Sequence, residues 1–179
     1  MDLKPESIKY LIVHHTATAR DTTTFDAVKK YHISKGWGDI GYHYFITADG
    51  KIWPGRAENI VGAHASISDM NFKSLGICLT GNFMNEVPTK TQLSSLETLL
   101  ISLKVKYNIA VENILGHQEI PASTACPGTN LLAWLKNFRK DYQEVKPTNN
   151  IAQVISHLEQ ATTILKNLWH EQPKRQSNI

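Results

Sequence analysis

Two histidines and a cysteine stand where the chain could carry out metal chemistry. His14 ends the apolar run of residues 10–13, and His117 stands just beyond a second apolar run at residues 114–115. Cys126 follows His117 after eight intervening residues, within one polar loop. Two imidazoles and a thiolate can hold a tetrahedral zinc ion and leave one position for water. Zinc in such a site lowers the pKa of its water toward about 7 and polarises a substrate carbonyl, which is the chemistry that amide hydrolysis needs.

Spacing alone leaves a simpler interpretation open. The chain has 8 histidines, and His14 and His117 are far apart in the sequence. Solvated or core histidines beside an incidental loop cysteine would produce the same spacing. The choice between the two interpretations depends on the elements and the motifs around these residues.

The three residues need a scaffold that places the ends of separate strands side by side. Short β-rich runs predict strands, and apolar residues at helical spacing predict helices. We expect strands at residues 10–13, 42–47, 52–53, 75–79 and 114–115, with a hairpin turn at 48–51. We expect helices from an N-cap within 22–24 to about residue 35, from a start within 88–91 to about residue 107, and after Gly128, with Ile33 among the apolar positions of the first helix. This alternation predicts an α/β (α+β) fold in which helices pack on a central mixed sheet.

The composition is that of a globular domain rather than a disordered or nucleic-acid-binding chain. The 179 residues are 41% hydrophobic and 20% charged, with a formal net charge of +3 and no polybasic run. No run of about 18 apolar residues predicts a membrane span, and the N-terminus lacks the apolar core of a signal peptide. Only two cysteines occur, and Cys78 lies in an apolar, strand-like run, so we interpret it as a small buried hydrophobe.

Six short motifs occur in a fixed order along about residues 8–140. They are VHHTA (13–17), GWGDIGYHYF (36–45), GAHA (62–65), SLGI (74–77), GNF (81–83), and GH (116–117) with ACPG (125–128). Together they resemble the type 2 N-acetylmuramoyl-L-alanine amidase family, which includes phage amidase-type lysozymes and peptidoglycan recognition proteins. The resemblance implies a central mixed β-sheet flanked by helices, with one zinc ion at the floor of a surface groove.

The resemblance assigns the metal and catalytic residues position by position. It implies that His14, His117 and Cys126 are the zinc ligands, whereas His15 occupies a position that varies in such proteins. Tyr42 resembles the family's catalytic tyrosine, although a core tyrosine is the alternative. Thr124 stands where some phage members have a lysine; its hydroxyl can donate a hydrogen bond to the reaction intermediate but brings no positive charge.

Several other motif residues are expected near the groove. By resemblance, His64 and Asn71 contact the muramyl-peptide, and Trp37 and Arg56 lie on the same rim. Trp37 is equally well interpreted as a packing residue. Arg56 either pairs with a stem-peptide carboxylate or is solvated.

Two further residues are expected to support the site. His43 is expected to be a structural histidine hydrogen-bonded beneath it. Glu119 is a candidate to orient a ligand imidazole, or else a solvated loop residue, and no carboxylate is an obvious general base.

The chain divides at a polar stretch around residues 144–150. We expect the amidase domain at residues 1–144, a linker at 145–150, an amphipathic helix at 151–172 and a frayed tail at 173–179. The helix has a mixed-charge polar face, which argues against membrane binding. It either packs on its own domain, self-associates with a second copy or binds another protein.

The resulting hypothesis is a zinc amidase that cuts between N-acetylmuramic acid and L-alanine of peptidoglycan. The alternative is a module that recognises muramyl-peptides without cutting them. With no classical signal peptide expected, the enzyme would be made in the cytoplasm. It would then reach the wall as a phage or bacterial lysin, or remain cytoplasmic as a recycling enzyme. Intact wall and anhydro-muropeptide both remain possible substrates, as do both stem-peptide types.

Overall fold

The computed structural model describes residues 1–144 together with Glu159. The expected linker at 145–150, the remainder of the expected helix at 151–172 and the tail at 173–179 lie outside the described residues. None of the helices within the described part of the chain is long and apolar enough to cross a lipid bilayer.

Five strands form one mixed sheet in the order β3-β2-β4-β1-β5. The strands are β1 (Tyr10–His15), β2 (Tyr44–Ile46), β3 (Ile52–Pro54), β4 (Ser74–Leu79) and β5 (Ile114–Gly116). β1 pairs in parallel with both β4 and β5, β2 pairs in parallel with β4, and only β3 is antiparallel to its neighbour. The central strands β1 and β4 are almost entirely buried, as expected for parallel strands with both faces covered. This confirms the expected mixed sheet.

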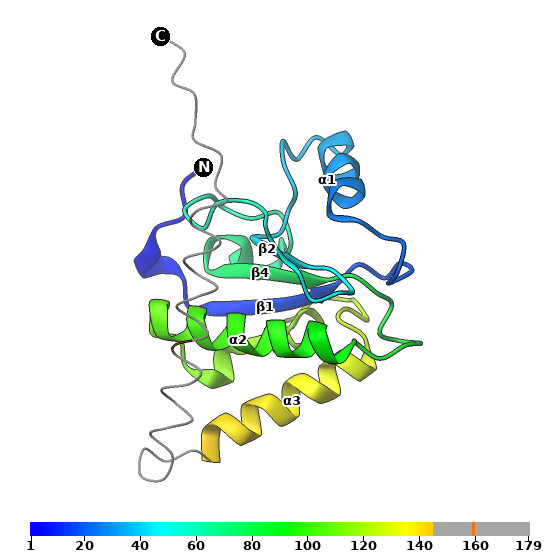
Figure 1. The fold of residues 1–179 in the computed structure, drawn as a ribbon. Coiled ribbons are helices and arrows are strands. Elements are labelled where there is room, and N and C mark those ends of the chain that lie inside the picture. The colour runs from blue at the N-terminus through cyan, green and yellow to red at the C-terminus, as the bar shows by residue number, and fades with distance from the viewer. Residues whose placement is uncertain (145–158, 160–179) are drawn as a thin grey trace.

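Within residues 1–144, three helices pack on the two faces of this sheet (Figure 1). They are α1 (Phe25–Ser34), α2 (Lys90–Tyr107) and α3 (Thr129–Glu144), and four short 3-10 helices connect other elements: η1 (Pro5–Ser7), η2 (Ile67–Phe72), η3 (Val111–Asn113) and η4 (His117–Glu119). Thr24 and Thr89 cap α1 and α2, since the Thr24 side chain accepts a hydrogen bond from the Ala27 N–H and that of Thr89 from the Gln92 N–H. The start of the two helices follows from these caps.

The main core lies between the sheet and the helices α2 and α3. Leu96, Leu99, Leu100 and Leu103 of α2 are completely buried, as their helical spacing predicts. Along β1, Leu11 and Val13 belong to this core, whereas Ile12 packs in a second cluster with Ala65 and Met70. Because side chains alternate between the faces of a strand, His14 shares the face of Ile12, opposite α2 and α3.

Two details of the expected elements are wrong. The second strand begins at Tyr44 rather than at Tyr42, so Tyr42 and His43 precede β2. Ile33 is 46% exposed, because the inward position near the end of α1 is taken by His32, whose Nδ1 accepts a hydrogen bond from the Gly41 N–H.

A carboxylate joins the far end of α2 to the sheet. Glu58 follows β3 and accepts hydrogen bonds from the hydroxyls of Tyr44 and Tyr107 and, at 2.7 Å, from the ammonium of Lys106. Burial raises the pKa of Glu58, but these three donors outweigh it and leave the pKa below its usual value. The ionised carboxylate therefore stabilises the fold.

We expect Glu58→Gln to lower the free energy of unfolding at neutral pH by roughly 1–2 kcal/mol, because charge-assisted hydrogen bonds are lost. A depressed folded-state pKa stabilises the protein above the unfolded value of about 4.3. That stabilisation is lost as the pH falls through the folded value, so the difference between wild type and variant should shrink in acid. Urea unfolding from pH 3 to 8 measures this, with the exposed Glu112→Gln as control. A difference independent of pH would contradict the role of the charge.

Candidate metal centre and adjoining cavity

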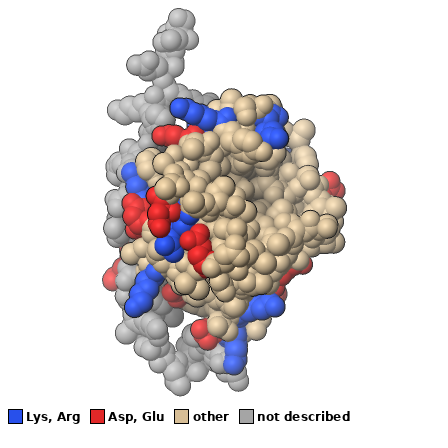
Figure 2. Space-filling model, turned by 90° about the vertical axis from the view of Figure 1, so that its right-hand side faces the viewer, with Lys and Arg blue, Asp and Glu red and all other residues tan. Residues whose placement is uncertain are grey.

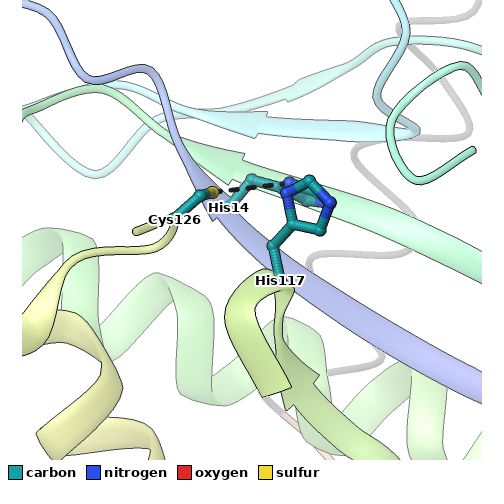
Figure 3. A group of neighbouring side chains, drawn as sticks. All are labelled: His14, His117 and Cys126. Carbon is teal, nitrogen blue, oxygen red and sulfur yellow. Dashed lines mark hydrogen bonds between the residues drawn. The ribbon is translucent and has the colours of Figure 1, made fainter. Parts of the chain in front are cut away.

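Three side chains converge near the carboxyl ends of β1 and β5 (Figure 3). His14 comes from the end of β1, His117 opens η4 directly after β5, and Cys126 lies in the loop before α3. One potential ligand atom from each lies within 4.8 Å of the others. The His14 Nδ1 and the Cys126 Sγ are 3.6 Å apart, and the imidazole centroids of His14 and His117 are 4.5 Å apart. Parallel pairing of β1 with β5 explains how histidines far apart in sequence become neighbours.

This donor set fits a zinc ion. Ligand atoms 2.0–2.3 Å from a tetrahedral zinc lie roughly 3.3–3.8 Å from one another, and the distance between His14 Nδ1 and Cys126 Sγ falls in that range. Two imidazole nitrogens and one thiolate sulfur match the chemistry that zinc prefers. Three protein ligands leave one tetrahedral position for water or substrate, as in catalytic rather than structural zinc sites.

The electrostatics of the three groups suit coordination by neutral imidazoles. Burial lowers the pKa of His14 well below its usual value, and neighbouring His64 and His117 lower it further. Burial also lowers the pKa of His117, so both rings are neutral near pH 7. Burial raises the pKa of Cys126 to about 12. A bound cation would counteract this shift, since its charge favours the thiolate.

The backbone around Cys126 holds its sulfur toward His14. The His15 N–H donates to the Cys126 Sγ at 3.4 Å, and the Cys126 N–H donates to the Thr124 Oγ1 at 3.1 Å. The His15 ring points elsewhere, because its Nδ1 accepts a hydrogen bond from the Phe83 N–H. His15 therefore lies outside the donor cluster, in keeping with its exclusion from the expected ligands.

Glu119 has neither of the positions expected for it. Its carboxylate makes paired hydrogen bonds to the guanidinium of Arg139, at 2.7 and 2.8 Å, and accepts a third from the Gly116 N–H at 2.9 Å. It thus fastens the turn that carries His117 to α3 rather than touching an imidazole. No sequence motif indicated this ion pair, because Arg139 lies among other charged residues of an amphipathic helix.

Tyr42 lies beside the donor cluster, with its ring centroid 5.2 Å from that of His14. Burial raises the pKa of Tyr42 well above its usual value, and the neighbouring thiols of Cys78 and Cys126 raise it further. The phenol therefore stays protonated and can donate a hydrogen bond. Cys78 is fully buried, as expected, and it pairs with His14 in the register of β1 and β4.

A cavity of about 600 Å³ opens next to the donor cluster. The described residues that line it include no lysine, arginine, aspartate or glutamate: Trp37, Ala63, His64, Ala65, Ser66, Ile67, Asn71, His117, Ala122, Ser123 and Thr124. Figure 2 shows the corresponding end of the molecule, where the hollowed part of the surface carries neither positive nor negative side chains. The lining is therefore suited to a neutral, hydrogen-bonding ligand surface.

Of the residues expected near the groove, Trp37, His64 and Asn71 line the cavity. Trp37 is 43% exposed and packs on His32, with ring centroids 4.6 Å apart, so it is both a packing and a rim residue. The Asn71 Oδ1 accepts hydrogen bonds from the backbone N–H groups of His64 and Ala65, so any substrate contact of Asn71 falls to its amide nitrogen. Ala122 and Ser123 also line the cavity and were not expected. Their position in the loop between His117 and Cys126 could have predicted this, since both ends of that loop lie at the cluster.

Arg56 does not reach the rim where it was expected, whereas His64 lines the cavity. Arg56 does not line the cavity; its guanidinium donates to the carbonyls of Trp37, Asp39, Ile40 and Val61, which favours a structural role over a contact with a stem-peptide carboxylate. His64 borders the cavity but is only 9% exposed, and its Nδ1 lies 3.0 Å from the His14 Nε2.

His43 is the structural histidine that was expected. Its Nδ1 accepts from the Gly76 N–H at 2.9 Å, and its Nε2 lies 3.0 Å from the Ile60 carbonyl. These two hydrogen bonds join the segment before β2 to β4 and to the loop after β3.

Comparison with known proteins agrees with this geometry. A family model described as N-acetylmuramoyl-L-alanine amidase matches residues 4–129. Peptidoglycan-recognition protein SC2 of Drosophila melanogaster is 37% identical over 132 residues, covering 69% of this chain and 70% of that protein. The endolysin of Escherichia phage T7 is 36% identical over 135 residues, covering 72% and 86%.

Solved structures show the same fold. The endolysin N-acetylmuramoyl-L-alanine amidase LysCS from Clostridium intestinale URNW superposes with a TM-score of 0.69 at 32% identity, over 80% of this chain and 88% of that chain. The residues matched by the family model, 4–129, contain all five strands of the sheet and the three residues of the donor cluster. Family model, relatives and structure agree, and the chain belongs to the N-acetylmuramoyl-L-alanine amidase family.

Proposed function

We propose that this protein is a zinc-dependent amidase that hydrolyses the bond between N-acetylmuramic acid and L-alanine in peptidoglycan. The observation that carries the proposal is the convergence of His14, His117 and Cys126 at the edge of a cavity of about 600 Å³. The donor set leaves one coordination position open, which a purely structural zinc site does not need. The family membership supplies the substrate class.

A zinc ion held by these residues would supply Lewis-acid polarisation of the scissile carbonyl and a water of lowered pKa. The residues of the chain supply the rest. Tyr42, kept protonated by burial, donates a hydrogen bond to the oxygen that gains negative charge. Thr124 lines the cavity, and because its Oγ1 accepts from the Cys126 N–H, its own proton points to other partners, including the substrate.

The cavity is the proposed place of the muramyl-peptide. Its uncharged lining suits the hydroxyl, acetamido and amide groups of such a ligand, and Trp37 offers an apolar face for a sugar ring or a peptide methyl group. Since no carboxylate lines the cavity among the described residues, the proposed mechanism assigns no side-chain general base.

A recognition module that binds muramyl-peptides without cutting them is the second candidate. Similarity to a protein named as a peptidoglycan-recognition protein favours it, as does Thr124, which brings no positive charge. The presence of both imidazoles, the thiolate and the phenol in one place favours the enzyme, since binding alone requires none of them.

Mass spectrometry after digestion of purified peptidoglycan and, separately, of anhydro-muropeptides tests the proposal. We expect free stem peptides with an unblocked N-terminal alanine, and we expect a chelator to abolish their release. The two substrates together distinguish a wall lysin from a recycling enzyme. Unchanged material despite bound zinc would establish the recognition module instead.

Cys126→Ala should lose at least about 100-fold in zinc affinity and all measurable turnover, because a site of two imidazoles lacks the thiolate charge. Metal content after dialysis and product release measure the two effects. Cys78→Ala is the matched control, since it removes the other cysteine and should retain zinc. Retention of both zinc and turnover by the Cys126 variant would contradict the assigned ligand.

Tyr42→Phe should lower kcat by roughly 100-fold while leaving zinc affinity and KM almost unchanged, because one hydrogen bond to the developing charge is removed. Steady-state kinetics on a soluble muropeptide give both constants. A KM effect alone would place Tyr42 in substrate binding.

Thr124→Val should lower kcat by about 10-fold, whereas Thr124→Ser should retain most of it, because serine keeps both the acceptor for the Cys126 N–H and the donor toward the cavity. Equal rates in the two variants would show that the hydroxyl does not contribute. Zinc content measured alongside separates this effect from a disturbed Cys126 loop.

A further inference from the structure

The two nitrogens of the His14 ring face different partners. Its Nδ1 lies 3.6 Å from the Cys126 Sγ, while its Nε2 lies 3.0 Å from the Nδ1 of His64. The His14 and His64 rings meet edge to face, with centroids 5.1 Å apart and planes at 82°. His14 is 2% exposed and His64 is 9% exposed, so this histidine–histidine hydrogen bond is shielded from water.

The chemistry of imidazole determines the direction of this hydrogen bond. A neutral ring that offers the lone pair of Nδ1 to a metal carries its proton on Nε2. The His14 Nε2–H then donates to His64, and the His64 Nδ1 is the acceptor. Such a partner fixes both the tautomer and the orientation of a ligand ring.

Neither ring nitrogen of His64 is available to a ligand in the cavity. The His64 Nδ1 is used by His14, and its Nε2 is buried without a hydrogen bond of ordinary geometry among the described residues, although the Ser74 backbone lies near the ring. His64 therefore offers no free ring nitrogen to the cavity. A direct polar contact with substrate, expected from the motif, would require the ring to leave its place.

The His64 ring packs closely against two glycines, and its backbone is held by a side-chain hydrogen bond. A Cβ atom added at Gly76 would lie 2.5 Å from both Cγ and Cδ2 of His64, and one added at Gly62 would lie 2.5 Å from Cδ2. Only glycine on β4 and in the loop before His64 leaves room for the ring. The backbone of this segment is also held in place, because the Asn71 Oδ1 accepts hydrogen bonds from the N–H groups of His64 and Ala65 at 2.9 and 2.8 Å.

We propose that His64 is a positioning residue that acts through His14, holding its Nδ1 toward Cys126 and His117, and that Gly62 and Gly76 are present to seat it. This inference rests on the proposed function, because it assumes that the three-residue cluster binds zinc. It assigns His64 to the metal centre rather than to the substrate surface, and it makes metal affinity the property that His64 controls.

Zinc affinity of the full chain, measured by competition with a chelating dye, tests the proposal without reference to catalysis. His64→Leu should weaken zinc binding 10–100-fold, the range typical of partners that orient a ligand. His64→Asn should stay within about threefold of wild type, because the Asn Oδ1 can occupy the place of the His64 Nδ1 and accept the same hydrogen bond. The visible spectrum of the cobalt-substituted protein should shift in the Leu variant and not in the Asn variant.

Controls separate positioning from substrate binding and from misfolding. His32→Asn changes another buried histidine whose Nδ1 also accepts a backbone N–H, and it should leave zinc affinity unchanged. Gly76→Ala keeps His64 but crowds its ring, and should weaken zinc binding in the same direction as His64→Leu. If His64→Leu does not fold, a folded Gly76→Ala with wild-type affinity overturns the proposal.

The outcomes distinguish this inference from the proposed function. A wild-type protein that binds zinc, together with a folded His64→Leu variant of equal affinity, overturns only the positioning role. A raised KM at unchanged zinc affinity in that variant also overturns it and returns His64 to the substrate surface. A wild-type protein that binds no zinc overturns the proposed function and this inference together.

Discussion

The site depends on the parallel pairing of β1 with β4 on one side and β5 on the other. Parallel neighbours end at the same edge of a sheet, so the last residues of β1 and the first residues after β5 are brought together there. His14 and His117 become neighbours for this reason, and the loop after η4 returns Cys126 to the same point. The pairing is possible because β1 and β4 are apolar enough to be buried on both faces, with α2 and α3 covering one of them.

Burial at that edge imposes a second constraint, since each polar group taken from water needs a partner. The His14 ring meets His64, the Cys126 sulfur meets the His15 N–H, and the Cys126 N–H meets Thr124. Farther out, Glu119 joins the turn of His117 to Arg139 on α3. These hydrogen bonds hold the donor atoms in place, which is what a catalytic metal site requires of its surroundings.

The cavity and the donor cluster differ in the chemistry that their side chains can supply. The described residues that line the cavity are uncharged, so the proposed mechanism assigns the polarisation of the scissile amide to the cluster and to the buried phenol of Tyr42. A binding module could use the same cavity without the donor cluster and without the phenol. This is the physical difference between the two candidate functions within one family, and it lies in a few side chains rather than in the fold.

The sequence by itself determined the residue types at the cluster and the order of strands and helices along the chain, because these follow from local periodicity and short motifs. It also placed His43 in a structural role. The tertiary structure decided which residues these side chains contact. Arg56 turned out to hold backbone carbonyls, and Glu119 to pair with Arg139. The contact between Gly76 and the His64 ring is visible only in the structure. A glycine inside a strand is nevertheless a sequence sign that another group approaches the backbone closely. Such contacts join residues distant in the chain, and they are set by how the sheet and its loops pack, which no local pattern records.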